Sequence, residues 1–278
     1  QHPKPTEYSF DLERALRCIV ALRANVPEDA FSAGNLGTER AGSAVQIRPG
    51  LFLTIGYLIM EADQVWLKSF DGRAVQGHAL AFDQETGFGL VQALGALDIP
   101  VMELGDSAGA RVGEPVIFAA AGGRRQCVAG RVAGRQEFAG YWEYLLDDAI
   151  FTTPSHPFWG GAALIGKDGK LLGIGSLVLQ QGGEGGKRQD MNMAVPVQLL
   201  LPILDDLLAY GRVNRPPRPW LGLFAMEDDD ALVIGSLADD GPADRAGLRI
   251  GDRILAVNGE EVPDLAGLWR AVWASGPA

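Results

Sequence analysis

Short apolar segments and turn residues alternate along most of the chain. From Gly42 onward, apolar runs of four to eight residues are interrupted about every ten residues by turn signals such as Asp71-Gly72, Gly122-Gly123 and Asp168-Gly169. Regularly spaced short strands of this kind are typical of an all-β sandwich or barrel. The segments predicted as strands are 44–47, 51–54, 65–70, 79–82, 90–94, 115–120 and 128–132.

The pattern changes in the second half of the chain. Apolar segments 162–166 and 171–179 flank the Asp168-Gly169 turn and predict a β-hairpin. Residues 194–210 predict an amphipathic helix that ends before Gly211, the residue type favoured just after a helix. Prolines and arginines over 213–219 indicate a linker. Beyond the linker we expect strands over 220–224, 232–237 and 253–257 and helices over 242–248 and 264–274.

Composition and charge exclude several classes of partner. The chain has 278 residues, 47% of them hydrophobic, so it can bury a sizeable core in two domains. Lys and Arg number 24 against 35 Asp and Glu, and the net charge of −11 argues against nucleic acid or an anionic membrane surface. No apolar run has the length of a membrane span. Cys18 and Cys127 are expected to be two buried free thiols, with one disulfide as the alternative.

Several motifs now resemble one protein family in their order and spacing. The N-terminal part resembles the trypsin-like protease domain of the HtrA/Deg family over roughly residues 15–212, and the C-terminal part resembles a bacterial PDZ domain. The protease-like motifs are Gly42-Ser43-Ala44-Val45, Leu53-Thr54-Ile55-Gly56-Tyr57, Asp83-Gln84-Glu85-Thr86-Gly87 and Phe158-Trp159-Gly160-Gly161-Ala162. The PDZ-like motifs are Gly241-Pro242-Ala243, Ala246-Gly247-Leu248 and Gly251-Asp252-Arg253-Ile254-Leu255.

The resemblance implies a mostly β architecture in four parts. An N-terminal arm over 1–14 would precede a trypsin-like double six-stranded β-barrel over 15–212. The linker over 213–219 would lead to a PDZ-type α+β domain over 220–278, which we expect to be incomplete because its last strand is missing.

The resemblance also assigns the three catalytic positions, and none of them holds a catalytic residue. The histidine position two residues beyond Ile55 is Tyr57, the aspartate position after Thr86 is Gly87, and the serine position is Gly160. A phenol with a pKa near 10 is a poor general base at neutral pH, and glycine offers neither a carboxylate nor a nucleophile. We therefore expect no protease activity.

The loop that would form the oxyanion hole is also altered. Phe158 stands where the family has glycine, and Trp159 follows it. The two rings either fill a cavity that lost its use or form an aromatic surface for another partner. A relocated dyad of Ser155 and His156 is a remote alternative, because adjacent residues of an extended segment point in opposite directions.

The PDZ-like unit retains more of its binding features. Trp220-Leu221-Gly222-Leu223 resembles the turn whose backbone N–H groups receive a chain-terminal carboxylate. Leu265, Leu268 and Trp269 on the opposite helix would complete a peptide groove. No metal or cofactor site is expected. Asp147-Asp148 and the turn 227–230 are interpreted as solvated charges, and 182–187 as a glycine-rich loop beside the former specificity pocket.

Two function hypotheses follow. The first is a catalytically inactive pseudoprotease that binds peptides or the C-termini of unfolded proteins as a chaperone-like or adaptor protein. The second is a regulatory or structural subunit that forms a homo-trimer or assembles with active relatives, with Tyr8 and Phe10 as contact candidates. The resemblance implies an extracytoplasmic, periplasmic location, and we expect that any signal peptide has been removed or was never present. An active endopeptidase with relocated residues is the remote third hypothesis.

Overall fold

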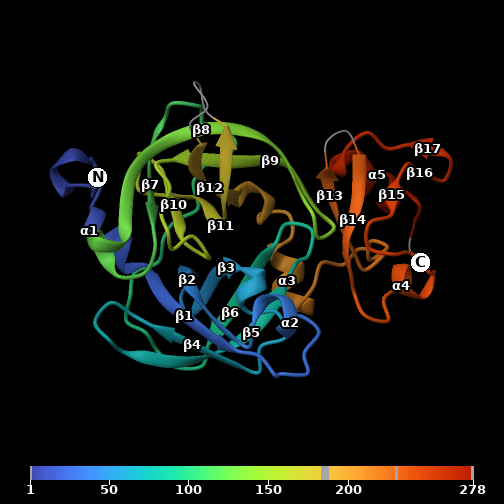
Figure 1. Cartoon of the computed structure of the whole chain (residues 1–278). Coiled ribbons are helices and arrows are strands. Elements are labelled where there is room, and N and C mark those ends of the chain that lie inside the picture. Colours follow the sequence, from blue (N-terminus) through green and yellow to red (C-terminus); the bar gives the residue numbers. More distant parts are fainter. Residues whose placement is uncertain (1, 183–187, 229–230, 277–278) are drawn as a thin grey trace. The chain divides into compact units, whose positions relative to one another are not determined.

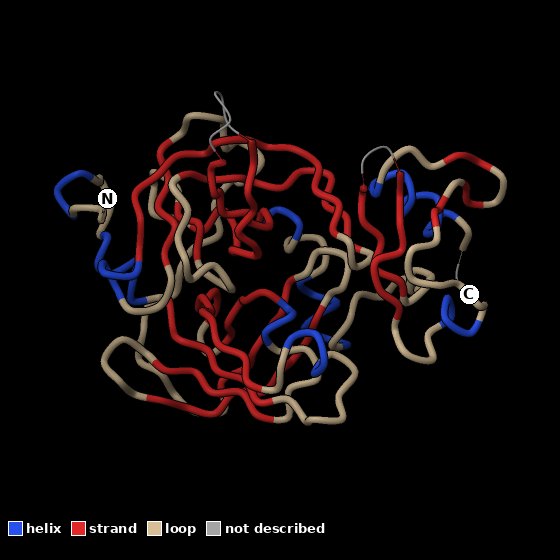
Figure 2. The backbone as a smooth tube through the Cα atoms, in the orientation of Figure 1, coloured by secondary structure: helices blue, strands red, loops and turns tan. Residues whose placement is uncertain are grey.

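The computed structural model describes residues 2–182, 188–228 and 231–276. The chain divides into two compact units, Gln1–Gln136 with Asp148–Val213 and Glu137–Asp147 with Asn214–Ala278 (Figure 1). The second unit thus includes a segment that the sequence analysis placed inside the 15–212 domain. Strands dominate the described chain and helices are short (Figure 2), which confirms the mostly β prediction. No helix of the described residues is long and apolar enough to cross a membrane.

The first closed barrel of the described chain is built from the N-terminal strands. Its order is β1-β2-β3-β6-β5-β4, and its neighbouring strands pair antiparallel, so that no edge stays open. Fully buried side chains of alternate strand positions fill it, among them Val20, Phe52 and Leu67. The strands are β1 (Ile19–Asn25), β2 (Glu39–Arg48), β3 (Leu51–Ile55), β4 (Gln64–Lys68), β5 (Ala74–Phe82) and β6 (Phe88–Ala93).

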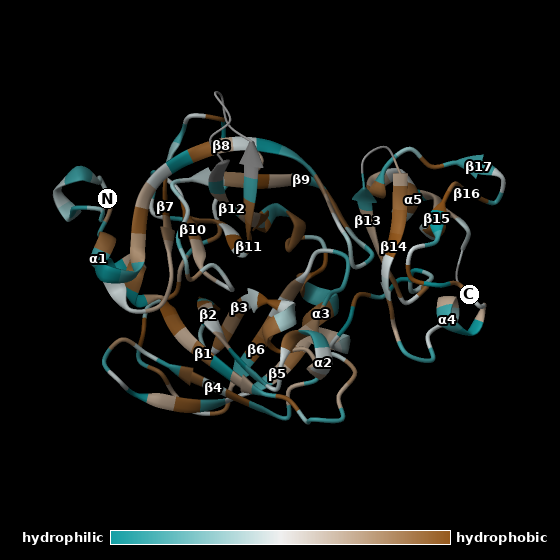
Figure 3. Cartoon of the chain, viewed as in Figure 1, coloured by the Kyte–Doolittle hydropathy of each residue, from teal (hydrophilic) through white to brown (hydrophobic). Residues whose placement is uncertain are grey.

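The second closed barrel of the described chain repeats this plan in the order β10-β11-β12-β9-β8-β7. Phe118, Ile150 and Leu164 belong to its buried apolar core, and apolar segments recur along the strands of both barrels (Figure 3). The strands are β7 (Pro115–Ala119), β8 (Cys127–Gly140), β9 (Tyr144–Thr153), β10 (Ala163–Ile165), β11 (Leu171–Gly182) and β12 (Arg188–Pro196). Residues 183–187 of the expected glycine-rich loop lie outside the described residues.

The helix expected over 194–210 is wrong in its first half. Residues up to Pro196 belong to β12, where Ala194 pairs with both Ile150 and Gly175. Neighbouring strands on both sides of β12 supply its backbone hydrogen-bond partners, and these distant strands cannot be inferred from the apolar stretch alone. A short 3-10 turn, η5 (Val197–Leu199), follows, and the helix α3 (Leu204–Tyr210) begins only after Pro202. It ends at Gly211, which is left-handed with φ of 70° as predicted for its cap.

Short helices and turns complete the first unit. Cys18 and Cys127 are buried and free, which confirms that expectation. The elements are η1 (Pro5–Glu7), α1 (Leu12–Arg17), α2 (Ala33–Leu36), η2 (Gly56–Leu58) and η3 (Gly123–Gln126).

In the second unit, a small sheet packs with a helix around its own core. The sheet has the order β13-β14-β15, and Trp269, fully buried on α5, lies in the core with Ala225 and Ile234. Helix α5 begins after Asp264, whose carboxylate accepts a hydrogen bond from Gly267 N at 2.7 Å as an N-cap. The elements are β13 (Leu223–Asp228), β14 (Ala231–Leu237), α4 (Pro242–Arg245), β15 (Arg253–Ile254), β16 (Ala256–Val257), β17 (Glu260–Glu261) and α5 (Leu265–Ala274). The expected turn 227–230 includes residues 229–230, which lie outside the described residues.

Candidate functional site

The fold brings the three predicted catalytic positions together. Tyr57 lies in η2 directly after β3, and its hydroxyl donates a hydrogen bond to the carbonyl oxygen of Ser176 at 2.8 Å. A Cβ atom on Gly160 would lie 3.0 Å from the Tyr57 hydroxyl oxygen. Gly56, the neighbour of Tyr57, donates its N–H to the carbonyl of Gly87 at 2.7 Å. The barrels therefore position a phenol and two glycines at one place.

Tyr57 is a weak base in this environment. Burial raises the pKa of its phenol well above the ordinary value of 10.0. The phenol therefore stays protonated at neutral pH, and its one proton is already directed at a backbone carbonyl. The Tyr57 phenol therefore cannot take a proton from a nucleophile, and Gly160 has no side chain that could serve as one.

The turn at Gly87 is organised by residues other than a catalytic acid. Asp83 accepts hydrogen bonds from the Thr86 N–H at 2.9 Å and from the Thr86 hydroxyl at 2.8 Å. Gly87 has φ of 80°, a left-handed conformation that favours glycine. Gly87 N donates to the Asp83 carbonyl at 2.8 Å and closes the turn. The turn is thus intact without a side chain at position 87.

The backbone conformation of the loop at Gly160 requires glycine at only one of its two glycine positions. Gly161 has φ of 73°, and a Cβ there would lie 1.9 Å from the carbonyl oxygen of Ser43. Gly160 accepts a hydrogen bond from Ser43 N at 2.9 Å, and Gly161 donates to Gly175 O at 2.9 Å. These bonds fix the loop against β2 and β11. Gly160 itself has an ordinary backbone, so the missing side chain there is not forced by the turn.

The backbone N–H of Phe158 is engaged inside the protein. It donates to Nδ1 of His156 at 3.1 Å, in a loop that Asn192 fixes through two bonds to the His156 backbone, of 2.6 and 3.0 Å. Phe158 lies in the loop predicted to form the oxyanion hole, and in this structure its N–H is directed at an imidazole. Burial lowers the pKa of His156, whose Nδ1 accepts the Phe158 N–H.

The two aromatic rings of this loop lie at the surface. Phe158 is 60% exposed and Trp159 is 36% exposed. The Phe158 ring contacts the His156 imidazole with 5.8 Å between ring centroids. Neither ring is part of the barrel core, so both are accessible to a partner.

The predicted carboxylate-binding turn receives a carboxylate of this chain. The N–H groups of Leu221, Gly222 and Leu223 donate to Glu143 at distances of 3.0, 2.7 and 3.4 Å to Oε1. Gly222 has φ of 73°, and Trp220, 47% exposed, packs against it. Sequence reasoning missed Glu143, because nothing near it in the chain marks it as a partner of residues 78–80 positions away.

The predicted helical side of the groove is covered. Leu268 and Trp269 are buried in the core of the second unit, and Leu265 is half-buried beside it. The indole N–H of Trp269 donates to the carbonyl of Gly140 at 2.8 Å. The expectation that Leu268 and Trp269 line an open groove is therefore wrong for this conformation, because residues of the 137–147 segment lie against them.

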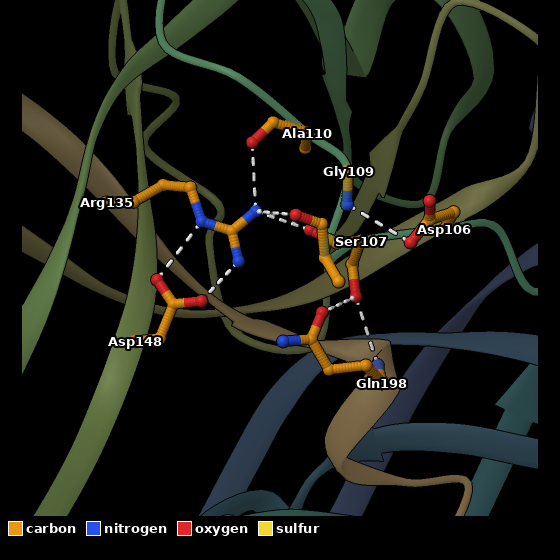
Figure 4. Close-up of polar contacts among 8 residues, drawn as sticks. Asp106, Ser107, Gly109, Ala110, Arg135, Asp148 and Gln198 are labelled. Atoms are coloured by element: carbon orange, nitrogen blue, oxygen red, sulfur yellow. Dashed lines mark hydrogen bonds and ion pairs between the residues drawn. The ribbon is translucent and has the colours of Figure 1, made fainter.

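Asp147 and Asp148 lie on strand β9 and not in a loop, and each pairs with an arginine. The Asp147 side chain is still 83% exposed, as expected of a solvated charge. Asp148 on β9 pairs with Arg135 on β8, whose Nε lies 3.1 Å from Oδ1 (Figure 4). Arg135 also donates to the carbonyls of Ser107 and Ala110. The Ser107 hydroxyl bonds to Gln198 at 2.7 Å in the same network.

The arm residues Tyr8 and Phe10 pack on their own unit. Their rings are 5.4 Å apart, and both are half-buried. The Phe10 ring lies over Gly169, where a Cβ would come within 2.6 Å of it.

Comparisons with known proteins agree with this architecture. Residues 42–174 match the model of the trypsin-like peptidase domain, and residues 233–271 match that of the PDZ domain. The relatives include two that are named "probable periplasmic serine endoprotease DegP-like". The one from Pseudomonas fulva is 26% identical, and the match covers 91% of this chain and 55% of the relative. The one from Halomonas elongata is also 26% identical, and the match covers 82% of this chain and 49% of the relative. The chain thus spans about half the length of these curated relatives.

Solved structures share the fold. The HtrA-type protease AlgW with a tripeptide has a TM-score of 0.59 at 24% identity, covering 96% of this chain and 88% of its own. The serine endoprotease from Yersinia pestis has a TM-score of 0.54 at 21% identity, covering 94% and 86%. With a peptidase-like double barrel followed by a PDZ domain, and with DegP-like relatives over most of its length, this chain is a member of the HtrA/Deg family.

Proposed function

We propose that this chain is a catalytically inactive HtrA/Deg protein, a pseudoprotease, that binds peptides or the C-termini of unfolded proteins as a chaperone-like or adaptor protein. One observation carries the inactive part: the Tyr57 hydroxyl, bonded to Ser176, adjoins Gly160, so a protonated phenol and a hydrogen atom stand where a base and a nucleophile are needed. Loss of the nucleophile or the base alone lowers turnover about a millionfold.

The lack of catalysis is tested by a gel time course with unfolded casein. The purified chain is incubated beside a Tyr57→Ala/Ser155→Ala double variant, with an active DegP-like protease as positive control. We expect cleavage only in the positive control. Cleavage by the parent chain that is absent from the double variant would return the protein to the active endopeptidases.

The binding part of the proposal is supported by three consecutive N–H donors that converge on a carboxylate. Leu221, Gly222 and Leu223 have the arrangement that receives a terminal carboxylate in backbone capture of peptides. Titration with fluorescent peptides that have free C-termini should show saturable binding, and Leu221→Asp should abolish it by placing a negative charge at the turn. Absence of saturable binding over a broad set of such peptides would contradict the proposal.

The location belongs to the same proposal. The relatives from Pseudomonas fulva and Halomonas elongata are named as periplasmic. We place the protein outside the cytoplasm on that basis, and fractionation of a cell that expresses the native gene is the direct test.

A further inference from the structure

The tip of the β8–β9 hairpin packs in the second unit between strand β13 and helix α5, with backbone contacts like those of a bound peptide. Residues Glu137–Asp147 belong to this unit. The carbonyl of Tyr141 accepts a hydrogen bond from Ala225 N on β13 at 3.0 Å, and the carbonyl of Gly140 accepts one from Trp269 on α5 at 2.8 Å. Strand β13 pairs on its other side with β14, so the hairpin occupies the edge to which a peptide would add.

The side chain of Glu143 occupies the position of a peptide's terminal carboxylate. Its Oε1 accepts N–H bonds from Leu221, Gly222 and Leu223, and its Oε2 accepts a second bond from Leu221 at 3.2 Å. Glu143 is only 7% exposed. These donors have no capacity for a second carboxylate at the same place, so a peptide terminus and Glu143 exclude one another.

The hairpin has its own internal order at this position. The rings of Trp142 and Tyr144 stack with 5.6 Å between centroids, and Tyr141 meets Trp142 edge-on at 4.8 Å. Glu143 has φ of 56°, a left-handed conformation that is uncommon for residues other than glycine. The hairpin thus holds Glu143 in a backbone conformation that glutamate does not favour, and its carboxylate is directed at the N–H groups of Leu221–Leu223.

The ion pairs of the hairpin are exposed. Arg270 on α5 pairs with Glu137 and with Asp147, and its side chain is 50% exposed. Exposed pairs of this kind contribute little to stability, so these two oppose exchange of the hairpin for another extended segment only weakly.

Burial makes the charge of Glu143 costly to hold at this turn. It raises the pKa of the Glu143 carboxyl above its usual value, because the N–H bonds offset the loss of solvation only in part. A peptide's terminal carboxylate is the same kind of acceptor, so it can replace Glu143 at these donors.

We propose that the hairpin Glu137–Asp147 is an intramolecular ligand of the PDZ groove, and that a peptide with a free C-terminal carboxylate binds only by displacing Glu143. The inference rests on the proposed peptide binding and adds its regulation: the groove is closed until a competing carboxylate opens it. Peptides without a free terminal carboxylate lack the group that competes.

The first test measures peptide affinity in the full-length chain. The probe is a fluorescein-labelled pool of nonapeptides ending in Val, Leu, Ile or Phe, made once with a free C-terminus and once with a C-terminal amide. We expect Glu143→Gln to bind the free-acid pool at least about ten-fold more tightly than the parent, because a charged acceptor of several N–H bonds is lost. Equal affinities of parent and variant, or an equal gain for the amide pool, would overturn the inference.

A matched control separates the loop contact from a general change of charge. Glu137→Gln removes the same charge from the same hairpin, but Glu137 contacts Arg270 and not the turn. Its effect on affinity should be less than about five-fold, as for an exposed ion pair. A gain as large as that of Glu143→Gln would show that loss of charge, not release of the turn, is responsible.

Hydrogen exchange tests the hairpin without any peptide. The amides of Leu221, Gly222 and Ala225 should exchange at least about ten-fold faster in Glu143→Gln than in the parent, because their acceptors leave. Unchanged exchange would overturn the inference even if peptides bind. Faster exchange without binding of any free-acid peptide to either protein would leave the closed groove standing and refute the proposed function.

Discussion

A Cβ atom on Gly160 would lie 3.0 Å from the hydroxyl oxygen of Tyr57, and that hydroxyl is bonded to the Ser176 carbonyl. The phenol therefore uses the space into which a serine side chain would project. At the scale of single residues, the two substitutions are complementary: the larger side chain at one catalytic position matches the smaller one at the other. A serine returned to position 160 alone would meet this hydroxyl.

This complementarity predicts an energetic coupling. Gly160→Ser should lower the free energy of unfolding by about 1 kcal/mol in the parent and by less in a Tyr57→Phe background, where the hydroxyl is absent. Denaturant unfolding of the four proteins of the cycle gives the coupling. Gly134→Ser, at a glycine with no atom within 4 Å of the added Cβ, is the control and should be near neutral. Additive effects of the two substitutions would contradict the contact.

His156 predicts a dependence of stability on pH. Burial lowers the pKa of its imidazole below the ordinary 6.5, so the unfolded chain binds a proton at a higher pH than the folded chain does. The free energy of unfolding that this residue contributes is therefore complete above about pH 6.5 and is lost as the pH falls through the folded pKa. Thermal unfolding between pH 5 and 8 should show this loss, and His156→Gln should reduce it.

His78 is the control for the pH experiment, because it is an exposed histidine on β5. His78→Gln should leave the pH profile of the parent unchanged. If His78→Gln flattened the profile and His156→Gln did not, the assignment to the buried imidazole would be wrong.

The catalytic positions could be located from sequence because their neighbours have structural tasks of their own. Thr54 donates its hydroxyl to Ser43 O at 2.7 Å, Thr86 organises the turn before Gly87, and Gly161 needs its positive φ. These residues keep the motifs recognisable although the predicted catalytic positions hold Tyr57, Gly87 and Gly160. Glu143 could not be predicted, because its role depends on a contact with Leu221–Leu223 that only the tertiary fold creates.

At the scale of elements, the β8–β9 pair is anchored below its tip. Arg135 on β8 bonds to Asp148 on β9 and to the carbonyls of Ser107 and Ala110 (Figure 4). Its side chain is 16% exposed, whereas that of Arg270, which pairs with the hairpin tip, is 50% exposed. The more buried arginine fixes the base of the hairpin, and the exposed one contributes little at its end.

This difference predicts unequal effects of two matched substitutions. Arg135→Met should lower the free energy of unfolding by about 2 kcal/mol, because the carbonyls of Ser107, Ala108 and Ala110 lose a charged donor. Arg270→Met should lower it by less than about 1 kcal/mol. Urea unfolding of both variants against the parent checks this, and equal losses would contradict the assignment of the anchor to Arg135.

Element boundaries followed from sequence where the signal was local. Asp264 marks the start of α5 and Gly211 the end of α3, because caps act within one turn. The stretch 194–196 was assigned to a helix because its apolar residues suit either structure. Its place in β12 depends on pairing with β9 and β11, which are distant in the chain.

At the scale of the whole molecule, a linker is predicted over residues 213–219, and the second unit joins Asn214–Ala278 with the earlier segment Glu137–Asp147. No composition shift marks that segment, because it continues two barrel strands. The chain therefore carries an acidic, peptidase-like body whose hairpin is part of its PDZ unit.

The proposed binding without cleavage predicts how the protein behaves beside an active relative. Mixed with a DegP-like protease and limiting casein, it should slow cleavage by sequestering unfolded substrate, and excess casein should abolish the effect because the binding sites saturate. The Leu221→Asp variant, in which the carboxylate-binding turn is blocked, should not slow cleavage of casein by the protease. A structural subunit would act differently, since co-assembly changes turnover of the protease itself and so persists at saturating casein. Gel-based rates at limiting and saturating casein, with light scattering of the mixture, therefore decide between sequestration of substrate and assembly with the enzyme.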